Sequence, residues 1–217
     1  TDFKIRFFAT LTFESIFCFV LEAGRLRARN KLVALAQAHE HAARTDELTG
    51  LANRRDMQSR LNNELSRFER SGHHFSVVLI DLDLFKRIND DFGHDAGDEV
   101  LRQFADLVRQ MVRQSDVAAR WGGEEFLLLL PDTTLLQALT LAERLRAEVA
   151  ATRFHHREQT LPVTISAGVC SISKSGSINE LLKQADVQLY NAKESGRNRI
   201  APRVRSQDAG PGPQTPA

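Results

Sequence analysis

Apolar residues recur along most of this chain at the spacings expected of buried strands and amphipathic helices. Short apolar or loosely alternating runs predict strands at residues 75–80, 117–121, 126–130, 163–172 and 198–201. Apolar positions three and four residues apart predict helices after Asn53, from about Gly97, and over residues 135–149 and 178–195. Strands that alternate with helices favour a single central sheet covered by helices.

The two strands that flank Gly122-Gly123 are expected to form a β-hairpin, because paired glycines are typical of tight turns between strands. A hairpin introduces antiparallel pairing, so we expect a mixed central sheet. The fold class is therefore α/β in the broad sense (α+β), and we assign this domain to residues 46–201.

The two ends of the chain differ from this domain. Residues 1–22 are rich in phenylalanine, but their apolar run is shorter than the roughly 20 residues of a spanning helix. We interpret them as the remnant of either an upstream membrane anchor or a sensor domain, since the chain begins at Thr1 as a fragment would. Residues 23–45 predict a signalling helix, packed in a dimeric coiled coil or against the domain. Residues 202–217 hold four of the 6 prolines and are expected to be a disordered tail.

Composition and charge exclude some classes of function. The formal net charge of +1 gives no overall positive field, which argues against nucleic-acid binding. The two cysteines, Cys18 and Cys170, lack metal-ligand spacing. We expect both to be small buried residues in a reducing compartment.

The stretch richest in candidate chemistry begins where the first predicted strand ends. Asp81 and Asp83 are two residues apart and would share one face of an extended chain. Neighbouring carboxylates are costly without a cation, and oxygen ligands suit Mg²⁺ or Mn²⁺. The alternative is that both side chains lie at a solvated strand end.

The predicted hairpin turn is the second candidate site. Gly122 and Gly123 would let backbone amides approach a phosphate closely, and the adjacent Glu124 and Glu125 would point to opposite sides. By itself this is equally an ordinary turn with charged, solvent-facing side chains. A small mixed sheet would place Asp81 beside Glu124, however, which favours a two-metal site for phosphoryl or nucleotidyl transfer.

Three basic residues are candidates for binding the phosphates of a nucleotide. Lys86 follows Asp81 closely, and Lys193 and Arg197 lie one helical turn apart. In each case a surface charge is the alternative. The sequence Gly-x4-Gly-Lys-Ser/Thr does not occur, which argues against a P-loop ATPase.

Taken together, these motifs make the chain similar to a known family. From about residue 46 to residue 200 it resembles the GGDEF family of diguanylate cyclases, with residues 122–126 as its GGEEF form. The supporting stretches occur in the family's order at residues 46–55, 81–98 and 192–199. The resemblance implies a bacterial domain of the polymerase-palm and nucleotide-cyclase fold that makes cyclic di-GMP from two GTP molecules. It would be cytoplasmic, and attached to the inner membrane if the missing upstream region is an anchor.

The resemblance also implies roles for the residues that match the family's motifs. Asp81 and Glu124, assisted by the carbonyl of Leu82, would hold Mg²⁺ or Mn²⁺, two ions per GTP. Glu125 would be a further metal ligand or would help to deprotonate the attacking 3′-hydroxyl. The other implied catalytic and substrate-binding residues are Lys86, Phe85, Asn89, Asp98, Gly122, Gly123, Lys193 and Arg197.

Asn89 and Asp98 are the residues that would read guanine. A carboxylate can accept hydrogen bonds from both N–H donors on the edge of guanine, whereas adenine presents an acceptor at N1. Such a site rejects the wrong base because a buried polar group is left unpaired.

Arg113 and Asp116 form a further candidate site, with five residues between Asp116 and Gly122. They resemble the family's inhibitory RxxD site for cyclic di-GMP. Arginine can stack on guanine or bind phosphate, and aspartate can accept from the guanine edge. An ordinary Arg–Asp pair near a helix end is the alternative.

We therefore expect a diguanylate cyclase that works as a homodimer, in which two domains face each other and each holds one GTP. The alternative is a catalytically silent domain of the same type that binds cyclic di-GMP as a receptor. An ATP cyclase is disfavoured by Asn89 and Asp98, and a purely structural domain leaves the clustered acidic residues unexplained.

Overall fold

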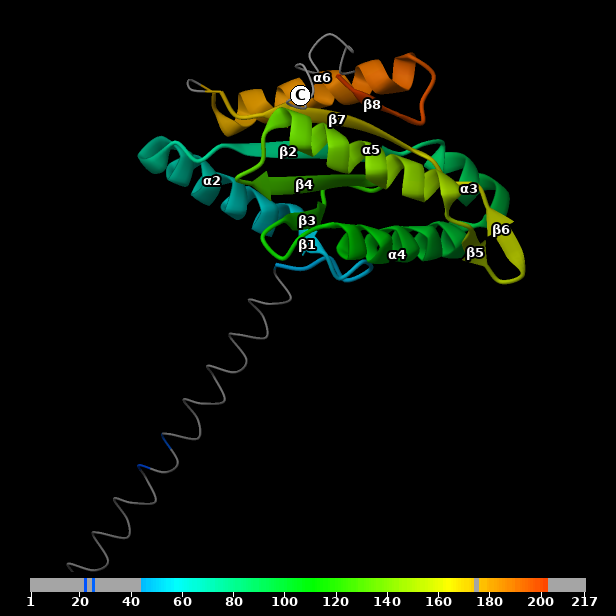
Figure 1. Cartoon of the computed structure of the whole chain (residues 1–217). Helices are drawn as coiled ribbons and strands as arrows, with labels where there is room; N and C mark the ends of the chain where they lie inside the picture. Colours follow the sequence, from blue (N-terminus) through cyan, green and yellow to red (C-terminus); the bar gives the residue numbers. More distant parts are fainter. Residues whose placement is uncertain (1–21, 23–24, 26–43, 174–175, 203–217) are drawn as a thin grey trace, which may run out of the picture. The chain divides into compact units, whose positions relative to one another are not determined.

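The computed structural model describes residues 22, 25, 44–173 and 176–202 of the chain. From Arg44 onward these residues form one unit, a six-stranded mixed sheet with helices on both faces (Figure 1). No helix within the described ranges combines the length and the hydropathy that a bilayer crossing requires. The expectations for residues 1–21, for most of 23–43 and for the tail after Pro202 lie outside the described residues.

The sheet has the strand order β1-β3-β4-β2-β7-β8. The central strand β2 is antiparallel to both β4 and β7, whereas the outer pairs β1–β3 and β7–β8 are parallel. The predicted mixed sheet and the predicted hairpin, β3–β4, are therefore confirmed. The strands are β1 (Ala52–Asn53), β2 (Phe75–Leu82), β3 (Val117–Arg120), β4 (Glu125–Pro131), β7 (Ile165–Ser171) and β8 (Arg199–Ala201), and β5 (Phe154–His156) and β6 (Gln159–Leu161) form a separate hairpin.

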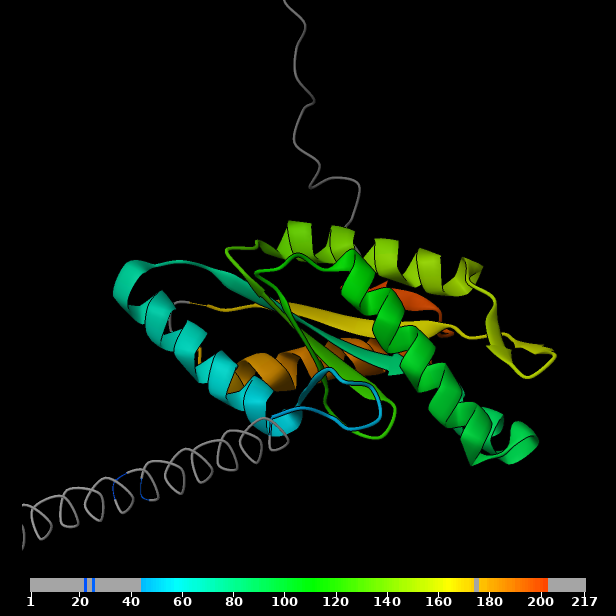
Figure 2. The same ribbon diagram turned by 90° about the horizontal axis from the view of Figure 1, so that it is seen from below.

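Helices cover the sheet in two layers, each with its own hydrophobic core (Figure 2). Alternate side chains of β2 show this division, because Val78 and Ile80 pack with one layer and Val77 and Leu79 with the other. One layer consists of α3 (Phe85–Phe92), α4 (His94–Met111) and α5 (Leu135–Ala151), and the other of α2 (Arg54–Ser71) and α6 (Ile178–Glu194).

Local caps explain why three of these helices begin where the sequence predicts. Asn53 accepts a hydrogen bond from the backbone N–H of Asp56 at the start of α2. Thr134 and Ser177 each form a capping box with the residue three positions later, at the starts of α5 and α6. Each cap satisfies backbone donors that would otherwise lack partners at a helix N-terminus.

The structure adds elements that the hydrophobic pattern does not reveal. The short helix α3, the strand β1 and the β5–β6 hairpin were not predicted, and α4 begins at His94, earlier than the expected start near Gly97. Helix α3 lacks a side-chain cap, and the preceding Leu84 has a φ of 57° in the left-handed region. With no side-chain cap to start it, α3 depends on packing against α4, where Phe85 and Ile88 enter the core.

Cys170 corrects a smaller expectation. It lies in β7 but is only partly buried, and its Sγ lies 3.0 Å from the Oε1 atom of Gln184. Burial raises the pKa of the Cys170 thiol, so it is held as a neutral thiol.

Candidate active site

Three strand ends meet at one edge of the sheet. Because β2 is antiparallel to both of its neighbours, its C-terminal end lies beside the N-terminal ends of β4 and β7. Asp81 is the register partner of Glu125 on one side and of Ser166 on the other. The backbone N–H of Leu82 donates to the carbonyl of Glu124 at 3.3 Å. The expectation that Asp81 and Glu124 lie at neighbouring strand ends is therefore correct.

Asp81 is a buried carboxylate paired with a lysine. Its side chain belongs to a residue that is only 5% exposed, and Lys193 Nζ lies 2.8 Å from its Oδ2 atom. Burial raises the pKa of Asp81, and the hydrogen bond and charge of Lys193 oppose this rise only in part. The charges of Asp83 and Arg197 also act on this carboxylate, in opposite directions.

Glu124 shares the same electrostatic environment. Burial is the first cause that raises its pKa, and the negative charge of Asp81 is the second. Glu125 adds to the rise, whereas Lys193 lowers it. These residues form a group of close acidic side chains whose repulsion a bound cation would relieve.

Glu125 closes the hairpin turn around Gly122. Its carbonyl accepts hydrogen bonds from the N–H groups of Trp121 at 2.8 Å and Gly122 at 3.2 Å. A Cβ atom on Gly122 would lie 2.8 Å from the Oε2 atom of Glu125, so glycine leaves room for this carboxylate. A Cβ atom on Gly123 would have nothing within 4 Å, so this position faces open space.

The donors at this edge fit a magnesium ion. Asp81, Glu124 and the Leu82 carbonyl are hard oxygen donors, and magnesium is commonly held by one or two carboxylates together with substrate phosphates and water. Within the described residues, no group of three or more His, Cys, Asp or Glu side chains could hold a metal. Two carboxylates and one carbonyl are fewer ligands than magnesium takes, so water and substrate phosphates would have to supply the others.

Asp83 does not share the surroundings of Asp81, although the two were expected to form a pair. Its Oδ1 atom accepts from Ser166 Oγ at 2.7 Å, and its Oδ2 atom accepts from Thr164 Oγ1 at 2.8 Å. The backbone N–H of Asn198 also donates to Oδ2, at 2.9 Å. Hydrogen-bond donors therefore satisfy this carboxylate, which leaves Asp81 as the acidic residue of the pair for a metal.

The predicted phosphate-binding residues lie around the same edge. Lys86 is exposed on the first turn of α3, and Arg197 is exposed just after α6. Phe85 is 6% exposed and its side chain belongs to the core, so only its backbone is left to contact a substrate. Lys193 faces Asp81, as described above.

The two residues expected to read guanine lie on adjacent helices. Asn89 is in α3 and Asp98 is in α4, with Gly93 between the two helices. A Cβ atom on Gly97 would lie 2.0 Å from the Oδ1 atom of Asn89 and 3.0 Å from Phe85 Cζ. Glycine at position 97 therefore allows Asn89 to lie against α4, one residue before Asp98.

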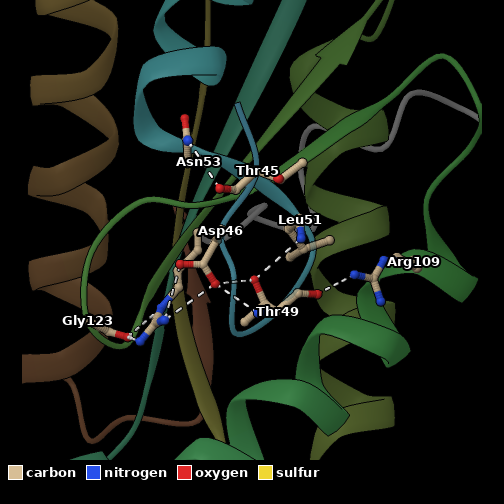
Figure 3. Close-up of polar contacts among 8 residues, drawn as sticks. Thr45, Asp46, Thr49, Leu51, Asn53, Arg109 and Gly123 are labelled. Atoms are coloured by element: carbon tan, nitrogen blue, oxygen red, sulfur yellow. Dashed lines mark hydrogen bonds and ion pairs between the residues drawn. The ribbon is translucent and has the colours of Figure 1, made fainter. Parts of the chain in front are cut away.

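A polar network links the hairpin to the turn before β1 (Figure 3). Arg120 donates to the Gly123 carbonyl from Nε at 3.1 Å and from a terminal nitrogen at 2.8 Å, and its other terminal nitrogen lies 3.3 Å from Asp46 Oδ2. Thr49 donates to Asp46 through its N–H at 2.9 Å and its hydroxyl at 2.7 Å, and Arg109 donates to the Thr49 carbonyl.

Asp46 belongs to the family motif at residues 46–55, whereas Arg120 was not among the expected site residues. Burial would raise the pKa of Asp46, but the hydrogen bonds from Thr49 and the charge of Arg120 outweigh it and lower the pKa. Asp46 therefore stays ionised and holds Arg120 against the hairpin. The feature of the sequence that could have identified Arg120 as a site residue is its position directly before Trp121-Gly122-Gly123.

Arg113 and Asp116 form a turn between α4 and β3. The Arg113 N–H donates to Asp116 Oδ2 at 2.9 Å, and the Asp116 N–H donates to the Arg113 carbonyl at 3.0 Å. Both residues line a pocket of about 410 Å³ together with Arg144 and Gln137 of α5. Arg144 was not among the expected residues, because only the packing of α5 brings it to this pocket.

The fold and the acidic strand ends define a nucleotide-handling α/β domain, and comparison with known proteins names its family. Residues 43–199 match the family described as "Diguanylate cyclase, GGDEF domain". The chain belongs to the GGDEF family.

Relatives with substantial sequence identity support this assignment. The response regulator PleD of Caulobacter vibrioides is 49% identical over 159 residues, which are 72% of this chain and 35% of PleD. The diguanylate cyclase DgcP of Pseudomonas aeruginosa is 46% identical over 189 residues, which are 82% of this chain and 28% of DgcP. The chain thus spans about a third of the length of these curated relatives.

Solved structures show the same fold. The coiled coil and GGDEF domain of DgcB from Caulobacter crescentus, in complex with c-di-GMP, matches with a TM-score of 0.76 and 30% identity. That match covers 83% of this chain and 97% of the other. The active GGEEF domain of a diguanylate cyclase from Vibrio cholerae matches with a TM-score of 0.66 and 38% identity, covering 69% of this chain and 96% of the other.

Proposed function

We propose that this chain is the catalytic part of a diguanylate cyclase, which joins two GTP molecules into cyclic di-GMP and releases pyrophosphate. One observation carries the proposal. Asp81 and Glu124 interact at the meeting point of three strand ends, with Lys193 and Arg197 close enough to act on the charge of Asp81. Carboxylates for metal ions and cations for phosphates are the groups that nucleotidyl transfer requires.

Asp81, Glu124 and the Leu82 carbonyl are the groups that would hold Mg²⁺ or Mn²⁺, with two ions per GTP. When bound, such ions neutralise phosphate charge and favour ionisation of a hydroxyl nucleophile. Glu125 would either complete this set of ligands or accept the proton of the attacking 3′-hydroxyl.

The remaining residues orient and neutralise the nucleotide. Asn89 and Asp98 hydrogen-bond the edge of guanine, which sets the choice of base. Lys86, Lys193 and Arg197 bind the triphosphate. The backbone at Phe85 and at Gly122-Gly123 approaches the phosphates without side chains in the way.

Two such domains form the reaction centre. Each binds one GTP, and the two face each other so that the 3′-oxygen of one GTP lies in line with the α-phosphorus of the other. A homodimer is therefore required for turnover, and residues 23–45 would set the distance and angle between the two halves. Attachment to a membrane through a region before Thr1 belongs to the same hypothesis.

The pocket beside Arg113 and Asp116 is proposed to bind the product and inhibit the enzyme. Two arginines, Arg113 and Arg144, line it with Asp116, a combination suited to phosphates and the guanine edge. We expect Arg113→Ala to abolish inhibition by added cyclic di-GMP while the initial rate is retained. Inhibition that persists unchanged in this variant would place the regulatory site elsewhere.

The direct test is incubation of the protein with GTP and Mg²⁺ over a wide range of protein concentrations, with products separated by chromatography. We expect cyclic di-GMP and pyrophosphate from the parent chain and neither from Asp81→Ala. Tight binding of cyclic di-GMP without any product would show instead that the domain is a receptor.

A further inference from the structure

Asp83 is a buried carboxylate that the proposed chemistry does not use. It is 6% exposed and follows the last residue of β2, two positions after Asp81. Its donors in the described structure are the hydroxyls of Thr164 and Ser166 and the backbone N–H of Asn198. Burying a carboxylate is costly unless hydrogen bonds replace water, so this arrangement requires a structural or functional reason.

The hydrogen bond to Asn198 joins parts of the chain that are 115 residues apart. Asn198 lies in the connection between α6 and β8, at the same end of the sheet as α3 (Figure 1). Arg197 and Asn198 have φ values of 59° and 46°, in the left-handed region that residues other than glycine rarely adopt. Surrounding contacts must hold such a conformation in place.

Further hydrogen bonds support this connection, among them one from the Arg197 N–H to the Ala192 carbonyl at 3.2 Å. Arg146 of α5 donates to Asn198 Oδ1 at 2.8 Å, and Arg199 Nε donates to the Arg197 carbonyl at 3.0 Å. Asp83 is the contact that ties the connection to β2, the strand that carries Asp81. The same connection carries Arg197 and follows Lys193, which pairs with Asp81.

We propose that Asp83 is a positioning residue that fixes the connection between α6 and β8 relative to Asp81. In this position Arg197 and Lys193 together bind a nucleoside triphosphate. Asp83 acts through hydrogen bonds and ligates no metal. The identity of the ligand as GTP rests on the proposed function. The positioning role rests on the hydrogen bonds of Asp83.

The chemistry of an amide makes a discriminating variant possible. In Asp83→Asn, the amide oxygen can accept from the Asn198 N–H and the Thr164 hydroxyl, and the amide nitrogen can donate to the Ser166 hydroxyl. Asp83→Asn therefore keeps the connection in place without the charge. Asp83→Ala removes every one of these contacts.

The test measures binding of a non-hydrolysable GTP analogue and of guanosine by calorimetry, with magnesium present. We expect Asp83→Ala to bind the analogue about 10-fold or more weakly, because loss of a supporting residue typically has an effect of this size on a bound group. Guanosine lacks phosphates, so its affinities for the parent and for Asp83→Ala should agree within about 2-fold. Asp83→Asn should bind the analogue with an affinity within about 2-fold of that of the parent.

A matched control separates positioning from general destabilisation. Ser76 is also buried and polar in β2, at the far end of the strand, where its Oγ donates to the Thr133 carbonyl at 2.7 Å. Ser76→Ala should leave the affinity for the GTP analogue and the affinity for guanosine unchanged. Hydrogen exchange gives a readout without ligand: the Asn198 amide should exchange faster in Asp83→Ala and at the parental rate in Asp83→Asn.

Several results would overturn the inference. Unchanged analogue binding or unchanged Asn198 exchange in a folded Asp83→Ala would do so. If Asp83→Ala does not fold, the Asn variants decide. A loss of affinity for the analogue that is as large in Asp83→Asn as in Asp81→Asn would show that the charge of Asp83 acts directly on the ligand. A parent chain that binds no triphosphate refutes both this inference and the proposed function, whereas a parent that binds the analogue but makes no product refutes only the latter.

Discussion

The ion pair between Lys193 and Asp81 shows how single residues set the state of this site. The ammonium of Lys193 lies 2.8 Å from the carboxylate that we expect to hold a metal ion. The lysine therefore partly neutralises a buried charge, and a metal ion would compete with it for the same oxygen.

This competition predicts the behaviour of Lys193→Met. Loss of the ammonium leaves Asp81 without its partner, so we expect the free energy of unfolding to fall by about 1–3 kcal/mol without metal. Added Mg²⁺ should raise the melting temperature more in this variant than in the parent. Lys183→Met, at an exposed position of the same helix, is the control and should show the parental response. An equal Mg²⁺ response in all three proteins would contradict the competition.

At the scale of elements, the contact between α3 and α4 decides where Asn89 and Asp98, the side chains that we propose to read guanine, lie. A methyl group at Gly97 would overlap with the Oδ1 atom of Asn89, at a separation of 2.0 Å. We expect Gly97→Ala to lower stability by about 1–3 kcal/mol through overpacking. We also expect the KM for GTP to rise about 10-fold, because Asn89 is displaced from the base.

A double-mutant comparison tests the cause of this effect. Removal of the Asn89 side chain relieves most of the overlap, so Gly97→Ala combined with Asn89→Ala should be more stable than Gly97→Ala alone. The KM for GTP should stay high in the double variant, since the side chain that reads the base is absent. Additive losses of stability in the two single variants would show that the overlap is not the cause.

The link between the β3–β4 hairpin and the turn before β1 predicts a pH dependence. The folded state lowers the pKa of Asp46, so this carboxylate stabilises the fold above its ordinary pKa of 3.8. That contribution is lost as the pH falls through the lower, folded-state value. Asp46→Asn lacks it at every pH.

We therefore expect Asp46→Asn to be less stable than the parent by about 1 kcal/mol at pH 7, because one charge-assisted contact is lost. The difference should be constant down to about pH 5 and should shrink below about pH 4. Urea unfolding across this range measures it. Asp106→Asn, which breaks an exposed pair with Arg109 on α4, should show almost no difference at any pH.

At the scale of the whole molecule, the proposed mechanism gives each domain half of a reaction centre. If two domains must face each other, the rate of cyclic di-GMP formation per chain should rise steeply with protein concentration and level off when the dimer is saturated. Rate measurements with light scattering at the same concentrations test this. A rate per chain that is independent of concentration, for a monomer, would refute the shared centre.

Local signals in the sequence were sufficient for most of the architecture. The apolar spacing over residues 135–149 and 178–195 and the continuous apolar run at residues 75–80 depend on neighbours in the chain, and the helices and the strand that they predict are present. Helix α3 was missed because packing stabilises it, without a cap. The candidate acidic residues were also evident, because Asp81 and Glu124 occur in motifs that the GGDEF family shares.

The sequence by itself thus determined the family, the mixed α/β fold and the types of residue at the site. Only the tertiary structure decided which side chains act together. Asp81 and Asp83 look equivalent in the sequence, yet one faces Lys193 and the other holds Asn198. Arg120 likewise has a partner far away in the chain, Asp46, and Arg144 lines the same pocket as Arg113 although the two are distant in sequence. The physical reason is that hydrogen bonds and charge interactions depend on distances in space, which strand order and helix packing set and which local patterns do not encode.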